Sequence, residues 1–363
     1  MNPLKQLQNF GQSVYLDELG RRMISDGTLA GLIRDDGIHG VTSNPAIFEK
    51  SIAGSDDYAE AIAELAARGM TPEQVYEELV VADIQAAADL FREQYDASDS
   101  EHGYVSLEVD PRLADDTDGT LAEARHLWER LDRPNVFIKV PGTEAGVPAI
   151  RMLTAEGINV NVTLLFGLKR YGEVVEAYIQ GLEERAASGA SVNRVASVAS
   201  FFLSRIDVLI DPVLQDKASG DASALLGKVA VANARLAYAH WQEVFGSERF
   251  EALARQGARR QKLLWASTGT KNPAYSETMY VEQLIGPDTV NTMPPATLDA
   301  YRNQGEPEDR LAGGIKGARA ELEALSALGI SLDEATEQLE REGVEKFVTP
   351  FESLMEAIRE AMA

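Results

Sequence analysis

The chain has 363 residues, of which 45% are hydrophobic, and this is enough to bury one large core or two ordinary ones. Its 34 basic and 58 acidic side chains give a formal net charge of −24, which argues against a nucleic acid or an anionic membrane as partner. The lack of cysteine excludes disulfides, thiolate metal sites and cysteine nucleophiles. The first residues contain no apolar signal segment, and no stretch approaches the ~20 apolar residues of a membrane span. We therefore expect a soluble, cytoplasmic protein.

Strand-like runs alternate with amphipathic helical segments, a pattern that favours a parallel sheet covered by helices. The eight runs are residues 12–16, 37–42, 104–109, 136–140, 158–165, 194–200, 262–267 and 289–293. Eight such units followed by helical sequence predict a (β/α)₈ barrel, a fold of ~250 residues before additions. We expect a single domain over residues 1–363, with residues 300–363 mainly forming C-terminal helices packed on the barrel.

Three helix starts are predicted from capping signals. Thr71 and Gln74 flank Pro72 in the pattern of a capping box with proline in the first turn. Ser331 and Thr349 begin two similar boxes near the C-terminus, so we expect a separate helix to start at each of them.

Several predicted strands have one apolar face and one polar face. In a barrel the apolar face packs against the helices, the polar face lines the interior, and active sites form where the strands end. The polar residues at that end are Asp17, Asn44, Glu108, Lys139 and Thr163. Each of them alone could be a satisfied structural group. Five at the same end of one barrel indicate a functional site.

Lys139 is the most informative of these residues because it lies inside the apolar run 136–140. Burial lowers the pKa of a lysine from its usual value near ~10.4, and a neutral amine is a nucleophile towards carbonyl groups. The alternative is a structural lysine whose ammonium reaches solvent from the end of the strand.

Five segments carry a resemblance to a known family. They are residues 40–45 (GVTSNP), 106–110 (SLEVD), 138–143 (IKVPGT), 161–166 (NVTLLF) and 200–205 (SFFLSR). In this order, and over nearly the whole chain, they resemble the transaldolases, the Schiff-base enzymes of the non-oxidative pentose phosphate pathway. The resemblance implies a permuted class I aldolase barrel of one of the longer bacterial subgroups, acting on sugar phosphates.

The resemblance also implies catalytic roles for four residues. Lys139 would form an imine with the ketose donor, and Asp17 would take the proton from the hydroxyl next to the breaking C–C bond. Glu108 would handle a catalytic water together with Thr163. These residue types suit the chemistry, since imine formation needs a neutral amine, a proton shuttle and a base. Nearby carboxylates raise the pKa of Lys139, whereas burial lowers it. Either the effect of burial dominates, or these groups share protons as a coupled set.

Further residues are implied as substrate ligands. Those for the dihydroxyacetone unit are Thr42, Asn44, Asn161 and Ser200, and Phe202 would lie beside the substrate unless it is plain core packing. Arg205 would bind the phosphate. Many members carry an arginine soon after the residue matching Ser267, whereas this chain has Lys271, which we infer to be its replacement. A lysine binds phosphate as a point charge, without the bidentate fork of arginine.

The predicted reaction moves a dihydroxyacetone unit from sedoheptulose 7-phosphate or fructose 6-phosphate to glyceraldehyde 3-phosphate or erythrose 4-phosphate. Two alternatives stay open: a Schiff-base aldolase that releases free dihydroxyacetone, and a non-catalytic sugar-phosphate-binding barrel. The four histidines are scattered without metal-ligand spacing, and we expect neither a metal nor a cofactor. The sequence does not decide between a monomer and a homodimer.

Overall fold

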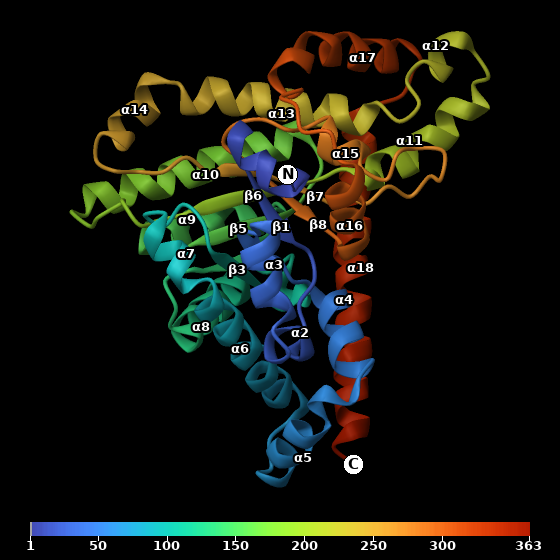
Figure 1. The fold of residues 1–363 in the computed structure, drawn as a ribbon. Helices are drawn as coiled ribbons and strands as arrows, with labels where there is room; N and C mark the ends of the chain where they lie inside the picture. The colour runs from blue at the N-terminus through green and yellow to red at the C-terminus, as the bar shows by residue number, and fades with distance from the viewer. Residues whose placement is uncertain (1) are drawn as a thin grey trace.

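The computed structural model describes residues 2–363 and contains a closed barrel of eight parallel strands surrounded by helices (Figure 1). The strands follow one another around the barrel in chain order, and β8 pairs with β1 to close it. They are β1 (Gln12–Leu16), β2 (Gly40–Val41), β3 (Tyr104–Glu108), β4 (Val136–Pro141), β5 (Val160–Leu165), β6 (Ser197–Phe202), β7 (Lys262–Ala266) and β8 (Thr289–Met293). This is the (β/α)₈ barrel expected from the sequence.

Two strands differ clearly from their predicted bounds. β2 is much shorter than predicted, because Gly37 still belongs to the end of a helix and Asn44 already caps the next one. β6 begins and ends later than predicted, because residues 193–194 form a turn while Phe201 and Phe202 pair with β7. Ser200 therefore lies within its strand and not at its end.

The helices cover the outside of the barrel and extend beyond both of its ends. In the first half of the chain they are α1 (Pro3–Gln6), α2 (Arg21–Ser25), α3 (Thr28–Asp36), α4 (Pro45–Phe48), the π-helix η2 (Glu49–Ala53), α5 (Ala59–Ala67), α6 (Pro72–Leu90), α7 (Arg92–Ala97), α8 (Thr117–Leu131) and α9 (Gly146–Glu156). In the second half they are α10 (Leu168–Ala187), α11 (Ser204–Asp216), α12 (Gly220–Ser223), α13 (Val229–Phe245), α14 (Glu248–Ala254), α15 (Met279–Glu282), α16 (Pro295–Gln304), α17 (Ile315–Ala327) and α18 (Leu332–Ala361). Short 3-10 turns are η1 (Leu7–Phe10), η3 (Asp56–Tyr58), η4 (Pro111–Leu113) and η5 (Ala312–Gly314).

The predicted caps are confirmed at two of the three positions. The Thr71 hydroxyl accepts from the backbone N–H of Gln74, whose side chain accepts from the Thr71 backbone, so the capping box of α6 is complete. Ser331 caps α18 in the same way through its hydroxyl. The helix start predicted at Thr349 is wrong, because α18 continues through it with Pro350 in its interior. Proline costs α18 one backbone hydrogen bond, and the helix persists because its apolar side is buried along its length.

The interior of the barrel is filled in layers, with aromatic rings near the N-terminal ends of the strands and polar groups nearer to their C-terminal ends. Tyr104 and Phe137 stack at 4.3 Å between ring centroids near the N-terminal ends of the strands. Above them the Asn161 amide donates to the Ser106 hydroxyl over 3.1 Å and accepts from the Ser200 hydroxyl over 2.7 Å. The polar faces of the strands thus point inward, as the alternation predicts, and the most polar layer lies towards the C-terminal mouth.

The long helix α18 crosses that mouth. In Figure 1 it is the red helix that runs alongside α4, and it also contacts α6, α11 and β5. Gly343 lets it approach closely, since a Cβ there would lie 3.1 Å from a methyl group of Leu164. Further along, the Phe351 ring packs edge-on against Tyr76 and under the guanidinium of Arg112.

None of the helices within residues 2–363 combines the length and the apolar character that crossing a membrane requires.

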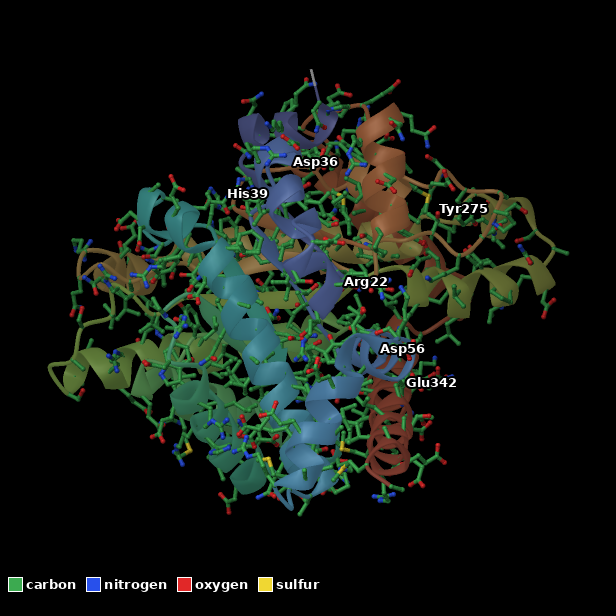
Figure 2. All side chains as sticks on the ribbon, turned by 60° about the horizontal axis from the view of Figure 1, so that its bottom comes forward. Arg22, Asp36, His39, Asp56, Tyr275 and Glu342 are labelled. Carbon is green, nitrogen blue, oxygen red and sulfur yellow. The ribbon has the colours of Figure 1, made fainter. Side chains whose placement is uncertain are left out.

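Two histidines lie against each other where the chain enters β2 and β3. The rings of His39, labelled in Figure 2, and His102 are 4.1 Å apart between centroids. The Nδ1 atom of His39 accepts from the backbone N–H of Val14, which requires an unprotonated nitrogen there. Burial lowers the pKa of His39 to about 3 and that of His102 to about 4, helped for His102 by Lys262 and opposed by Glu101.

We predict that this pair destabilises the fold in acid. The unfolded chain binds protons at these histidines below a pH of about 6.5 and the folded chain does not, so the free energy of unfolding falls as the pH drops towards 4. Each histidine adds up to about 1.4 kcal/mol per pH unit to that slope. In urea unfolding between pH 4.5 and 7, His102→Gln should give a flatter slope than the wild type. Equal slopes for the wild type and His102→Gln would contradict the prediction.

Candidate functional site

Lys139 and Glu108 form a buried pair at the centre of the mouth. The parallel register places them opposite each other on β4 and β3, and the alternation turns both side chains inward. The Nζ atom of Lys139 donates to Oε2 of Glu108 over 3.0 Å and to the backbone carbonyl of Ser43 over 2.9 Å. Only 5% and 4% of the two side chains are exposed. The sequence pattern that singled out Lys139 gave no sign of the Ser43 carbonyl.

Burial controls the charge of this pair. It raises the pKa of Glu108, an effect that the nearby ammonium of Lys139 opposes and the charge of Asp17 reinforces. The second oxygen of Glu108 is buried and has no hydrogen-bond partner within residues 2–363. The carboxyl group of Glu108 is therefore suited to hold a proton next to the amine.

Asp17 is the second carboxyl group of the site and is half-buried. It follows β1, and its backbone N–H is bonded to the carbonyl of Met293 in β8. The Thr42 hydroxyl donates to Oδ1 of Asp17 over 2.6 Å and is itself bonded to the Thr292 hydroxyl over 2.6 Å. Burial raises the pKa of Asp17, while the bond from Thr42 opposes the change. Thr42 thus orients Asp17, which is well suited to accept a proton.

Thr163 lies in the wall of the site, directly before an irregularity in β5. The register with β6 shifts between Val162 and Leu165, and Leu164 has a φ of 61°, in the left-handed region that non-glycine residues rarely adopt. The Thr163 hydroxyl is buried and finds no hydrogen-bond partner in the described part of the chain. It remains available to a water molecule or a substrate, as does the free oxygen of Glu108.

These groups surround one cavity. The predicted residues in its wall are Asp17, Thr42, Asn44, Lys139, Thr163, Ser200, Phe202, Arg205, Ser267 and Lys271. Glu108 and Asn161 are not in that wall and reach it through their bonds to Lys139 and Ser200. The oxygen of Asn44 caps α4 by accepting from the Ile47 backbone, and its NH₂ group is left for a ligand. The structure adds Thr292, Lys346 and Phe347 to the wall.

The basic end of the cavity is built on α11 and on the chain after β7. Arg205, in the first turn of α11, has its Cζ atom 5.4 Å from the centroid of the Phe202 ring. Ser267 has a φ of 55°, and its hydroxyl is 2.8 Å from that of Ser204. Lys271 follows on the same loop and is exposed. Phe201 instead packs outward against Tyr171 and Trp265, so only one of the two adjacent phenylalanines faces the cavity.

Phe347 is the residue that the sequence least suggested. It projects from α18, is buried, and its ring centroid lies 5.6 Å from Nζ of Lys139. A phenylalanine on the apolar face of a terminal helix is ordinary core composition, and its position in the chain gives no hint of an active site. Its place above Lys139 depends on the path of α18.

Comparisons with known proteins agree with this geometry. The family model described as Transaldolase/Fructose-6-phosphate aldolase matches residues 14–358. The chain belongs to this family. It is 49% identical to a transaldolase of Saccharopolyspora erythraea, over 99% of this chain and 97% of that one. It is 50% identical to transaldolase 1 of Streptomyces coelicolor over 99% and 94% of the two chains, and 48% identical to a transaldolase of Thermobifida fusca over 100% and 99%. The resemblance inferred from the sequence is thereby confirmed.

The close contact at Gly343 allows a test of whether the packing of α18 against the barrel supports stability and activity. We predict that Gly343→Val destabilises the protein by about 1–3 kcal/mol, because the added methyl groups collide with Leu164 and Phe166. Activity should fall with it, since the collision moves α18 away from Lys139. Gly317→Val in α17 is the matched control, because a Cβ there has nothing within 4 Å. Urea unfolding and assay of both variants check this, and equal stability in the two would contradict it.

Proposed function

We propose that this chain is a transaldolase that moves a dihydroxyacetone unit from a ketose phosphate to an aldose phosphate through an imine on Lys139. The observation that carries the proposal is the buried contact of Glu108 with the amine of Lys139, which lies in the wall of a cavity. Such a pair is suited to a nucleophilic amine that must lose a proton before it attacks a carbonyl. We further propose that it acts in the cytoplasm, since a cysteine-free chain suits that compartment.

Imine formation uses Lys139, Glu108 and Thr163. The neutral amine attacks the ketose carbonyl, and a carbinolamine forms. Glu108 then supplies a proton to the departing hydroxyl group, which leaves as water, and takes it back in the reverse step. Thr163 and the second oxygen of Glu108 have hydrogen-bonding capacity to spare, so they can hold this water between them.

Cleavage of the C–C bond uses Asp17. It accepts the proton of the hydroxyl group on the carbon next to the breaking bond. The electron pair of that bond passes to the neighbouring carbon and on into the protonated imine, which gives an enamine and a free aldose. Addition of a second aldose reverses these steps, and hydrolysis of the imine releases the new ketose. The raised pKa of Asp17 suits a group that must hold a proton between the two halves of the reaction.

The two ends of the cavity bind different parts of the substrate. We assign Asn44 and Ser200 to the hydroxyl groups of the dihydroxyacetone unit, with Asn161 holding Ser200 and Thr42 holding Asp17. Phe202 packs beside the substrate, and Arg205, Ser267 and Lys271 bind its phosphate. The partners are therefore sugar phosphates.

The alternative is an aldolase that releases free dihydroxyacetone, since the family description includes fructose-6-phosphate aldolases. The relatives that match over nearly the whole chain are named transaldolases, which favours transfer. Product analysis with and without an aldose acceptor separates the two reactions. Only a transaldolase requires the acceptor for turnover.

Lys139 should be the site of covalent capture. With fructose 6-phosphate and borohydride, we expect a reduced three-carbon adduct on Lys139 and loss of activity, detected by peptide mass mapping. Lys139→Arg should give no adduct, because a guanidinium stays protonated. Lys169→Arg, a change to a lysine outside the cavity wall, is the control and should react normally. An adduct on another lysine would refute the assignment.

Substitutions of Asp17 and Glu108 should slow different steps of the reaction. Asp17→Ala should still form the imine with the intact six-carbon donor but cleave it at least about 100-fold more slowly, as for loss of a general base. Glu108→Gln should instead slow imine formation itself by a similar factor. Rapid-quench trapping with borohydride, followed by mass analysis of the adduct size, distinguishes them. The same defect in both steps for both variants would contradict these roles.

A further inference from the structure

Besides Lys139, three cationic side chains from three separate elements line the cavity. Arg205 comes from α11, Lys271 from the loop after β7 and Lys346 from α18. Asp17 is the one acidic side chain in the wall formed by residues 2–363. The sequence pointed to Arg205 and Lys271 but not to Lys346, and none of the roles assigned above uses it.

Arg205 has no counter-ion among residues 2–363. Its Nη1 atom is buried and has no hydrogen-bond partner, and the guanidinium makes no ion pair within 4.0 Å, in the part of the chain that the structure describes. Burial lowers the pKa of Arg205, and the more distant charge of Glu342 opposes the change. A desolvated guanidinium with an unused N–H is suited to bind an anion such as a phosphate group.

Lys346 is held beside this cavity by a weak and exposed contact. Its Nζ atom lies 3.0 Å from Oε2 of Glu342, one helical turn earlier on α18, and 53% of its side chain is exposed. Glu342 is labelled in Figure 2 on the red ribbon of α18. Exposed ion pairs of this spacing are weak, so the ammonium group can leave Glu342 and bind a doubly charged phosphate instead.

Glu342 therefore acts on both cations. It lies near Arg205 and bonds Lys346, and it has a negative charge that an incoming phosphate must displace. The next residue after Lys346 is Phe347, which contacts Lys139. One turn of α18 thus reaches both the proposed imine site and the basic end of the cavity.

We propose that Lys346 is a third cationic ligand for the substrate phosphate, which it binds from α18 together with Arg205 and Lys271. The identity of the substrate in this assignment rests on the proposed function. The binding of a phosphate group does not depend on it. It gives the C-terminal helix a direct part in substrate recognition. It also supplies a second flexible charge where this chain lacks a second arginine.

Calorimetric titration with inorganic phosphate tests the assignment without relying on catalysis. Lys346→Ala should raise the Kd for phosphate about tenfold, the equivalent of one lost charge contact. Lys346→Arg should restore most of the affinity. Glu342→Gln should lower the Kd about threefold, since the competing carboxylate is gone. Arg341→Ala, the loss of an exposed neighbouring charge outside the cavity wall, is the matched control and should change nothing.

Steady-state kinetics give the corresponding result with substrates. Lys346→Ala should raise KM for fructose 6-phosphate about tenfold, with kcat within about twofold and no change for unphosphorylated fructose. An unchanged Kd and KM in Lys346→Ala, or an equal rise in KM for both ketoses, would overturn the assignment. A wild type that binds phosphate through Lys346 but forms no adduct on Lys139 would refute the proposed function and leave this inference standing.

Discussion

The rest of the site depends on the burial of an amine and a carboxyl group in contact with each other. Transferring two charges from water to this interior costs several kcal/mol per ion before their attraction is counted. Burial therefore favours the protonated, uncharged form of the Glu108 carboxyl group. The contact is fixed by the register of β3 and β4, in which Glu108 and Lys139 are direct partners. Closure of the barrel in turn fixes that register.

The closed barrel alone leaves its mouth open to water, and α18 is what covers it. The aromatic ring of Phe347 shields Lys139, while Gly343 lets the helix come close enough to bring it there. Pro350 lies four residues after Lys346 and cannot donate to its carbonyl, so the helical bonding is weakest beside the cavity. Both the barrel and the C-terminal helix α18 thus exclude water from the amine of Lys139.

Much of the barrel and part of the site follow from local sequence patterns. Polar residues on alternate positions of a strand can only point inward in a barrel, which is why Asp17, Lys139 and Thr163 could be predicted to converge. The bounds predicted for β1 and β8 agree with the structure. The proline at 350 was misleading, because a Thr-Pro pair is a good local start signal that continuous packing of α18 overrides.

Other features could not be predicted because they arise from contacts between distant parts of the chain. The backbone carbonyl of Ser43 bonds Lys139 across 96 residues, and a carbonyl has no sequence signature. The left-handed conformation of Leu164 contradicts its local preference and is imposed by the shift between β5 and β6. Lys346 and Phe347 reach the cavity only because α18 crosses the barrel mouth.

The pH dependence of imine formation by dihydroxyacetone, measured in a single turnover, tests most directly whether Lys139 and Glu108 share a proton. The reactive state has one proton in the pair, so the rate should fall on both sides of an optimum in the wild type. With glutamine at position 108 there is no acid to lose, and the rate should rise with pH to a plateau and not decline. Profiles of the same shape for both proteins would show that Glu108 does not hold the proton and would contradict the account.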